Sequence, residues 1–279
     1  MTNNQQQTTN NKQQFCFSIL ALGAKYQLLA KEFAKDLEKH SPETTVVVGT
    51  DNPQAFQDCS QVLAFKLDRK GIFHCYHDKR FVIEQALTKF PVVIQIDADT
   101  RIIGSLPESM NNQVSPEEDY QKPNLSTDAL AAVHIENLVE HVQKYNPERL
   151  NHLRKLAAKL EIDLDTVTYI GESLFAVLAN GDKTVEFIQQ WDAIARYLEL
   201  HGIHGGSGNG IGLAAAKVGL EIIQPSWLEE INQVRHHIDA SRLKSRKTLG
   251  NKLKRRIGYH YRLNKERIIA IKDFNFYYH

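Results

Sequence analysis

Two carboxylates at the end of an apolar run are the residues of this chain best suited to chemistry. Residues 91–96 (PVVIQI) are mostly apolar, which is typical of a strand buried on both faces. Asp97 and Asp99 follow directly. Side chains two positions apart on a strand share a side, and carboxylates are ligands that hard divalent cations prefer. The spacing predicts a cation site at this strand end, with two aspartates that merely terminate the strand as the simpler alternative.

A lysine and an arginine lie next to each other at the start of a predicted helix, residues 78–89, that leads into this strand. Cationic side chains in the first turn of a helix oppose its dipole. A bound diphosphate would explain why Lys79 and Arg80 are placed there, because a guanidinium can bind phosphate oxygens in a bidentate manner. A solvated pair on an exposed helix end explains the same two residues equally well.

Strand and helix patterns alternate over the first hundred residues. The predicted strands are residues 15–22, 44–50, 61–67 and 91–96, and the predicted helices are 26–40 and 78–89. This alternation predicts an α/β fold with a parallel sheet and helices on both faces. Right-handed crossovers bring the strand ends at Leu22, Thr50 and Asp97 to one edge, where open α/β sheets bind ligands. The sequence has no Gly-x-Gly-x-x-Gly or Walker-type loop, so dinucleotide and P-loop classes lose support.

Three segments depart from the alternation. Residues 1–14 are polar and predict a disordered tail. Residues 105–160 predict an insertion with helices around 128–145 and 147–161. Residues 241–279 predict a basic C-terminal extension, whose last residues (IIAIKDFNFYYH) suggest a final strand or a docking segment.

The C-terminal charge is local, because the whole chain carries a net charge of only +1. Residues 240–262 contain nine Lys or Arg and no Asp or Glu. Such a block could contact an anionic membrane surface, a polyanionic or lipid-diphosphate acceptor, or nucleic acid. A solvated helix face is the remaining alternative.

The composition is that of an ordinary globular protein, with 42% hydrophobic and 24% charged residues. Three cysteines, an odd number without metal-type spacing, predict free thiols in a reducing compartment. No apolar run approaches the roughly 18 residues of a membrane span, and no signal-peptide pattern is present. We therefore expect a cytoplasmic protein, with membrane association through the basic block as a further expectation.

The order of these motifs resembles the nucleotide-sugar-dependent glycosyltransferases of the GT-A fold and Asp-x-Asp type. The resemblance covers residues 15–240 and includes the segment 169–175 (YIGESLF), which looks like the strand that faces donor sugar and acceptor. It implies a mixed, mostly parallel sheet flanked by helices, with residues 105–160 inserted. It also implies a hexosyltransferase-like enzyme that takes a nucleotide-sugar donor, with a UDP-sugar as first choice. A saccharide or a lipid-linked molecule would accept the sugar, and no nucleic acid partner is expected.

The same resemblance implies residue roles. Asp97 and Asp99 would hold a manganese or magnesium ion that bridges the donor diphosphate. His236 and His237 are both candidates for the third metal ligand, with His237 preferred and a surface histidine pair as the alternative. The residues implied to bind the nucleotide-sugar are Thr50, Asp51, Lys79, Arg80, Asp97 and Ala98.

Glu172 is the candidate catalytic acid, and its role stays open. It could orient the acceptor hydroxyl, stabilise positive charge on the sugar, act as the base of an inverting reaction, or be a structural acid. Residues 201–210 (HGIHGGSGNG), where some retaining relatives carry an acid, contain five glycines and no carboxylate. This segment predicts a close backbone approach or a lid, with a flexible connector as the alternative. Retention and inversion therefore remain equally open.

Two other classes fit parts of the sequence. A nucleotidyltransferase of related fold would use similar acids, but it usually has a Gly-rich basic loop after the first strand, which Gly23-Ala24-Lys25 matches poorly. A non-enzymatic polyanion-binding protein would use the C-terminal basic block. The first hundred residues favour the glycosyltransferase.

Overall fold

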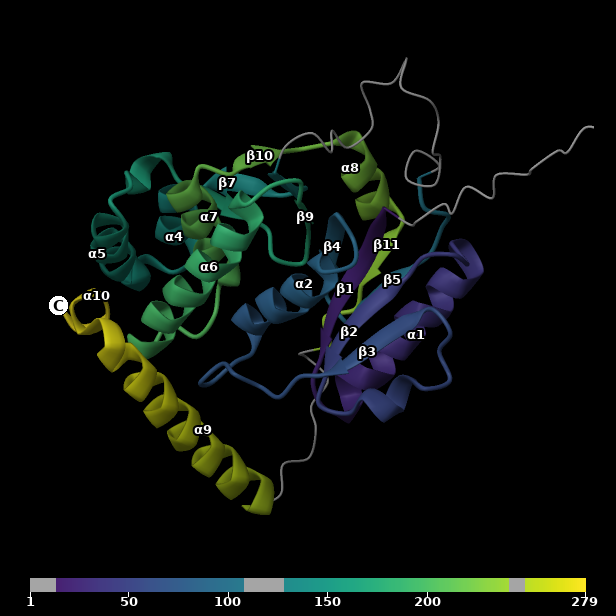
Figure 1. The fold of residues 1–279 in the computed structure, drawn as a ribbon, viewed down its shortest axis with the longest axis horizontal. Helices are drawn as coiled ribbons and strands as arrows, with labels where there is room; N and C mark the ends of the chain where they lie inside the picture. The colour runs from purple at the N-terminus through teal and green to yellow at the C-terminus, as the bar shows by residue number, and fades with distance from the viewer. Residues whose placement is uncertain (1–13, 108–127, 241–248) are drawn as a thin grey trace, which may run out of the picture.

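The computed structural model describes residues 14–107, 128–240 and 249–279, and within them a seven-stranded sheet forms the centre of the molecule (Figure 1). The strand order is β10-β6-β9-β4-β1-β2-β3. The strands are β1 (Phe15–Ala21), β2 (Val46–Thr50), β3 (Val62–Lys66), β4 (Val92–Ile96), β6 (Ala129–Ala132), β9 (Leu174–Leu178) and β10 (Glu221–Ile223).

The sheet is mixed and mostly parallel, as predicted. Strands β1, β2, β3 and β4 are parallel neighbours, and β10 is parallel to β6. Strand β9 runs antiparallel to both β4 and β6 and is the odd member. Because β1 and β4 run in the same direction, their carboxyl ends meet at one edge, which is the geometry that the site prediction requires.

Both faces of the sheet are covered by helices, because alternate side chains of the strands enter two separate apolar cores. Phe17 of β1 packs in the core that contains Phe33 of α1 (Ala24–His40), whereas the adjacent Cys16 packs in the core that contains Trp191 of α6. The first core also takes in α8 (Ser226–Gln233). The helices on the second face include α2 (Lys79–Leu87), α5 (Leu150–Leu160), α6 (Lys183–Leu200) and α7 (Ser207–Val218).

Two short ribbons lie outside the central sheet. Strand β5 (Thr100–Ile102) pairs antiparallel with β11 (Arg235–His237), and β7 (Ile135–Asn137) pairs antiparallel with β8 (Thr168–Ile170). The short 3-10 helices are η1 (Pro53–Phe56), η2 (Tyr76–Asp78), η3 (Pro147–Arg149) and η4 (Leu164–Thr166).

The helix predicted from residue 128 is wrong in its first half. Residues 129–132 form strand β6 in the interior of the sheet, and helix α4 begins only at Leu138 (Leu138–Tyr145). All four residues of β6 are buried between β9 and β10, and three of them are alanines. Burial between two strands overrides the helical preference of this short run. Residues 108–127, in the predicted insertion, lie outside the described residues.

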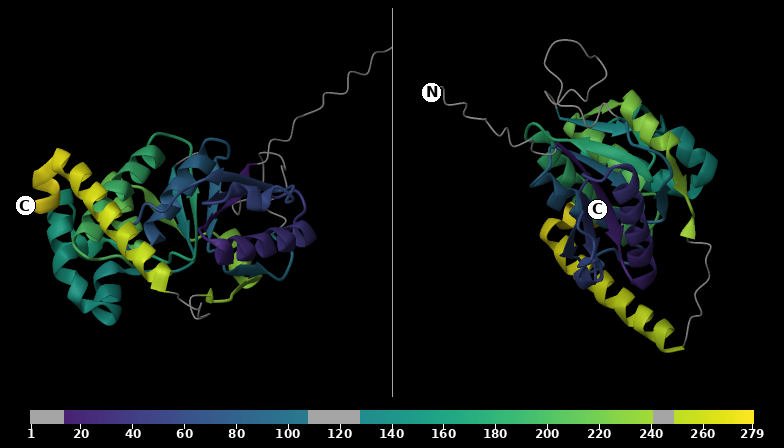
Figure 2. Two further views of the ribbon diagram at one scale, coloured as in Figure 1. Left: turned by 90° about the horizontal axis from the view of Figure 1, so that it is seen from below. Right: turned by 90° about the vertical axis from the view of Figure 1, so that its right-hand side faces the viewer.

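The C-terminus is helical, so the final strand suggested by the sequence is wrong and the docking alternative holds. Helix α9 (Leu249–Ala270) runs along the outside of the molecule and is followed by η6 (Ile271–Asp273) and α10 (Phe274–Tyr278) (Figure 2). Arg262 donates to the carbonyl oxygens of Gly71 and Ile72, and Arg196 pairs with Glu266 at 2.7 Å. No helix in the described ranges is long and apolar enough to cross a bilayer.

Candidate active site at the carboxyl edge of the sheet

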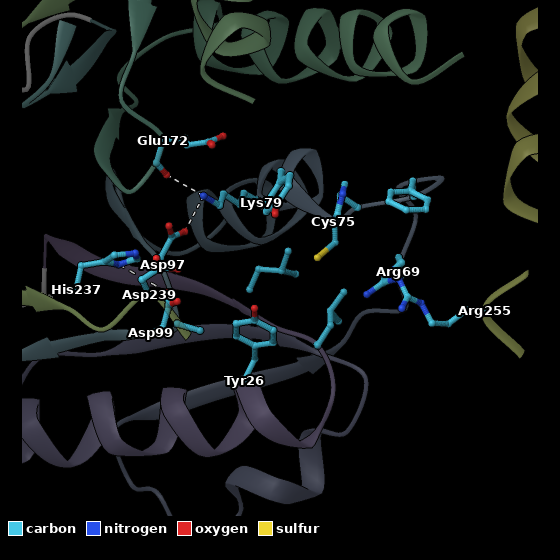
Figure 3. Close-up of a pocket in the computed structure, with 16 residues that line it drawn as sticks. Tyr26, Arg69, Cys75, Lys79, Asp97, Asp99, Glu172, His237, Asp239 and Arg255 are labelled. Atoms are coloured by element: carbon cyan, nitrogen blue, oxygen red, sulfur yellow. Dashed lines mark hydrogen bonds and ion pairs between the residues drawn. The ribbon is translucent and has the colours of Figure 1, made fainter. Parts of the chain in front are cut away.

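A cavity of about 470 Å³ opens at the edge where β1 and β4 end (Figure 3). Its floor includes Leu20 and Leu22 at the end of β1, and the Asp97-Ala98-Asp99 motif follows β4. Elements distant in the sequence contribute the remaining walls. The cavity therefore lies where open α/β sheets place their ligands.

The two aspartates lie in a turn rather than on the strand itself. Strand β4 ends at Ile96, and the amide of Thr100 donates to the Asp97 carbonyl at 3.1 Å to close the turn. The argument from strand periodicity was therefore wrong, although the expectation that both side chains face one space agrees with the structure. Asp97 is part-exposed to the cavity, whereas Asp99 is 9% exposed.

His237 reaches the aspartates through the β5–β11 ribbon, in which it pairs with Thr100, the residue after Asp99. His237 Nδ1 lies 3.8 Å from Asp99 Oδ1, and one ligand atom each of Asp97, Asp99 and His237 lies within 4.8 Å of the others. The amide of Ala240 donates to the other Asp99 oxygen at 2.8 Å and fixes the carboxylate. His236, the neighbour, pairs with Arg101 and is not part of this cluster.

Lys79 binds the first aspartate from the opposite wall. Its Nζ lies 2.7 Å from Asp97 Oδ1 and donates to the backbone carbonyl of Glu172 at 2.8 Å (Figure 3). The side chain is 7% exposed. Burial alone lowers the pKa of the Lys79 ammonium, but the carboxylates of Asp97 and Glu172 outweigh it and leave the pKa above its usual value. Lys79 therefore carries a fixed positive charge beside Asp97.

Arg80 does not share this position. Its guanidinium donates to Asp192 at 2.9 and 2.6 Å and to the carbonyl of His77 at 2.6 Å, in a different cavity on the far side of α2. Successive helical residues point about 100° apart, so Lys79 and Arg80 cannot both face the same ligand. The joint phosphate-binding role predicted for the pair does not fit this geometry.

Thr50 and Asp51 lie at the same edge of the sheet, but neither lines the cavity. Thr50 is fully buried, and its hydroxyl accepts from the amide of Asn52 at 3.2 Å. Asp51 accepts from the amide of Gly23 at 2.8 Å and from the Gln27 side chain at 2.7 Å. Asp51 therefore holds the loop after β1 and the start of α1, and Thr50 holds the turn after β2. The predicted contact of both residues with a nucleoside remains a prediction.

Glu172 lies in the turn between β8 and β9, because the segment expected as one strand is two strands. It lines the cavity, and its carboxylate accepts a short hydrogen bond from the hydroxyl of Ser207, the first residue of α7. With its backbone carbonyl bound by Lys79, the Glu172 turn is held from two sides.

Two glycines of helix α7, Gly208 and Gly212, pack directly against strand β8. A Cβ added at Gly208 would lie 2.1 Å from the carbonyl oxygen of Ile170, and one added at Gly212 would lie 1.9 Å from that of Thr168. Only glycine allows helix α7 to approach strand β8 this closely. The close backbone approach suggested by the sequence is therefore what the structure has at Gly208, which lies in the buried helix α7, whereas Gly202, Gly205 and Gly206 lie in the loop before this helix.

Several cavity residues could not be singled out from the sequence. Tyr26 extends from the first turns of α1, and His74 stacks on Tyr76 with ring centroids 4.9 Å apart and an interplanar angle of 23°. Arg69 and Arg255 lie at the end of the cavity away from Asp97 and Asp99 (Figure 3). Arg255 comes from α9, so the basic C-terminal segment lines the cavity, and its charge run was the one available signal.

The cavity thus has chemically distinct ends. One end holds two carboxylates, an imidazole and a lysine, and the other holds two arginines, with aromatic side chains between them. Two carboxylates and an imidazole fit a divalent cation such as manganese or magnesium, because oxygen ligands dominate the set. Asp97 and the 41% exposed side chain of His237 leave the cluster open toward the cavity.

Comparisons with known proteins leave the chain without an assigned family. No family model matches it, and no curated protein matches it. Among solved structures, the chain is similar to the apo structure of WbbM, a bifunctional glycosyltransferase, with a TM-score of 0.44 and 13% sequence identity. The match covers 75% of this chain and 38% of that chain, so this chain spans well under half of its length.

Proposed function

We propose that this chain is a glycosyltransferase that transfers a sugar from a nucleotide-diphosphate sugar in the presence of a divalent cation. The observation that carries the proposal is the cluster of Asp97, Asp99 and His237 at the carboxyl edge of the sheet, inside a cavity large enough for part of such a donor. Manganese or magnesium suits this ligand set. The function rests on this cluster together with the motif order of the sequence.

Different residues of the chain would bind different parts of the donor. Asp97, Asp99 and His237 would hold the cation, which when bound supplies a Lewis acid beside the diphosphate leaving group. Lys79 adds a second positive charge that requires no reorganisation, because Asp97 and the Glu172 carbonyl already orient it. Ala98 would contact the donor from the floor of the cavity.

Glu172 is the carboxylate placed to act near the transferred sugar. Its hydrogen bond from Ser207 orients the carboxylate, and the turn around it is fixed by Lys79. In this position Glu172 can accept a hydrogen bond from an acceptor hydroxyl and stabilise positive charge as it develops on the sugar. We leave the stereochemistry unassigned.

The aromatic and basic parts of the cavity suggest partners. Tyr26 and the stacked His74 and Tyr76 offer flat surfaces for a nucleobase, and we propose a UDP-sugar as the donor. Arg69 and Arg255 at the opposite end suit an anionic acceptor group, which fits a lipid-linked acceptor better than a neutral saccharide.

Helix α9 provides a second reason to consider lipid. Leu253, Ile257 and Tyr261 recur every four residues on α9 and are 61%, 62% and 70% exposed, and Lys254 and Arg256 are exposed beside them. Apolar side chains flanked by basic ones on one helix match the chemistry of an anionic membrane surface. We propose that α9 makes a peripheral membrane contact near the cavity.

The function is tested with the purified full-length chain and a panel of nucleotide-sugars. We expect a UDP-sugar to raise the melting temperature only when manganese or magnesium is present, and to be hydrolysed or transferred under the same conditions. Asp97→Asn with Asp99→Asn keeps the shape of both side chains and should abolish both effects. Asp58→Asn, at an exposed acid outside the cavity, is the matched control and should change neither.

Two results would contradict the proposal. Cation-dependent donor binding that persists in the Asp97/Asp99 double variant would remove the metal assignment. Absence of donor binding across the panel, with a folded wild-type chain and saturating cation, would remove the glycosyltransferase assignment itself.

A further inference from the structure

A second group of potential metal ligands lies outside the cavity, at the junction of β7 and α4. His134 Nε2 lies 2.6 Å from Glu136 Oε1, and His141 Nδ1 lies 3.3 Å from Glu136 Oε2. One ligand atom from each of the three residues lies within 4.8 Å of the others. None of the three lines the cavity that holds Asp97 and Asp99.

The local fold explains why these three side chains meet. His134 immediately precedes β7 and Glu136 is the second residue of this strand, and their side chains meet at 2.6 Å. Asn137 caps α4 by accepting from the amide of Glu140 at 3.1 Å, and the first turn of the helix then carries His141 back toward Glu136. The cluster is thus assembled by a strand, a capping residue and one helical turn.

Tyr169 orients both imidazoles. It pairs with Glu136 across the β7–β8 ribbon, and its ring stacks on His141 with centroids 3.5 Å apart and an interplanar angle of 11°. The ring of His134 meets the same tyrosine edge to face, with centroids 6.0 Å apart. Contacts that fix the rings of potential ligands are the kind that support a metal site, because they reduce the entropy lost on binding.

We propose that His134, Glu136 and His141 form a transition-metal site that prefers zinc. Two imidazoles and one carboxylate are a ligand set that zinc binds with a further position left open. Two ligand atoms of a tetrahedral zinc lie roughly 3.3 Å apart. The distance between His141 Nδ1 and Glu136 Oε2, 3.3 Å, already has this value. The distance between His134 Nε2 and Glu136 Oε1 must widen by roughly 0.7 Å to reach that value, and a small rotation of the 58% exposed His134 side chain against Tyr169 provides it.

This site differs in chemistry from the cluster in the cavity. Two of its three ligands are nitrogen, which favours zinc over manganese and magnesium, whereas two of the three at Asp97, Asp99 and His237 are oxygen. The proposal therefore does not depend on sugar transfer.

Backbone contacts connect the proposed zinc site to the candidate active site. The carbonyl of His134 accepts from the amide of Gly171 at 2.8 Å, and Gly171 immediately precedes Glu172. A Cβ added at Gly171 would lie 2.8 Å from His134 Cβ, so the two segments are in close contact. A metal bound by His134 therefore fixes the strand against which the Glu172 turn packs.

The experiment uses the full-length chain with Asp97→Asn and Asp99→Asn, so that binding at the cavity does not contribute. Isothermal titration with zinc should show one ion bound per chain, and zinc at 100 times its Kd should raise the melting temperature by roughly 5 °C or more. Manganese at the same concentration should give a smaller shift. Cobalt should give visible absorption bands that Glu136→Gln abolishes.

Single substitutions in this background locate the ion. His134→Ala and Glu136→Gln should each weaken zinc binding at least tenfold, and His134 is exposed enough for its variant to fold. His260→Ala, at an exposed histidine of α9, is the matched control and should bind zinc as the parent does. No zinc binding by the parent, or equal binding by His134→Ala and Glu136→Gln, would show that the three residues form a hydrogen-bonded group only and would overturn the proposal.

Discussion

Replacing Gly212 by alanine probes how closely helix α7 must approach strand β8. The added Cβ would lie 1.9 Å from the carbonyl oxygen of Thr168 and 3.0 Å from its carbonyl carbon. Both are backbone atoms of a paired strand, so helix or strand must shift by more than about 1 Å to restore a normal contact of roughly 3.5 Å. Overpacking of this kind costs about 1–3 kcal/mol or more, and the better helix propensity of alanine offsets about 1 kcal/mol.

We therefore expect Gly212→Ala to lower the free energy of unfolding by about 2 kcal/mol, since the contact is at the severe end of the range. For a chain of this size the melting temperature should fall by roughly 4–8 °C, measured by circular dichroism or calorimetry. Gly250→Ala is the matched control, because its Cβ meets nothing within 4 Å in helix α9 and should leave stability equal or slightly higher. A Gly212→Ala protein as stable as the wild type would refute the close packing of α7 on β8.

Two further predictions concern charge. Burial raises the pKa of Glu199 to about 7 from 4.5, so the folded chain binds this proton more tightly than the unfolded chain. Stability from Glu199 is present below about pH 4.5 and is lost as the pH rises to about 7. Glu199→Gln should therefore gain on the order of 3 kcal/mol relative to wild type across that window in urea unfolding, and a constant difference would refute the assignment. Lys254→Glu with Arg256→Glu should weaken sedimentation with anionic vesicles at least tenfold at low salt. The matched control on α5, Arg154→Glu with Lys155→Glu, should leave sedimentation unchanged. An equal loss in both double variants would reject α9 as the membrane contact.

The early part of the fold could be predicted because its signals are local. Apolar strands alternating with amphipathic helices predicted β1, β2, β3 and β4 to within two residues. The sheet edge at which Asp97 lies follows from parallel strands and right-handed crossovers, which hold for almost any sequence with this alternation. Local periodicity was sufficient for β1, β2 and β4 because these strands are buried on both faces, whereas β3 is the part-exposed edge strand and was recognised from its short apolar run.

Other features of the fold and of the cavity depend on tertiary contacts that no local sequence pattern encodes. Residues 129–132 favour helix by composition and become a strand only because β9 and β10 lie on either side. Lys79 and Arg80 read as one basic pair, yet the turn of the helix sends them to different cavities. Arg255 enters the cavity only through the docking of α9, which rests on tertiary hydrogen bonds made by Arg262.

The β5–β11 ribbon has a consequence for how the chain folds. It joins Asp99 to His237 across 138 residues (237 minus 99), and Asp99 is also bound by the amide of Ala240. Closing so long a loop carries an entropic cost that is recovered only once both ends are in place. During synthesis Asp97 and Asp99 therefore emerge well before His237 and Ala240, whereas Lys79, which pairs with Asp97, is already present. The cluster of Asp97, Asp99 and His237 is assembled only after residue 237 has folded back, so the cation binding that we propose for it would report whether the whole domain has closed.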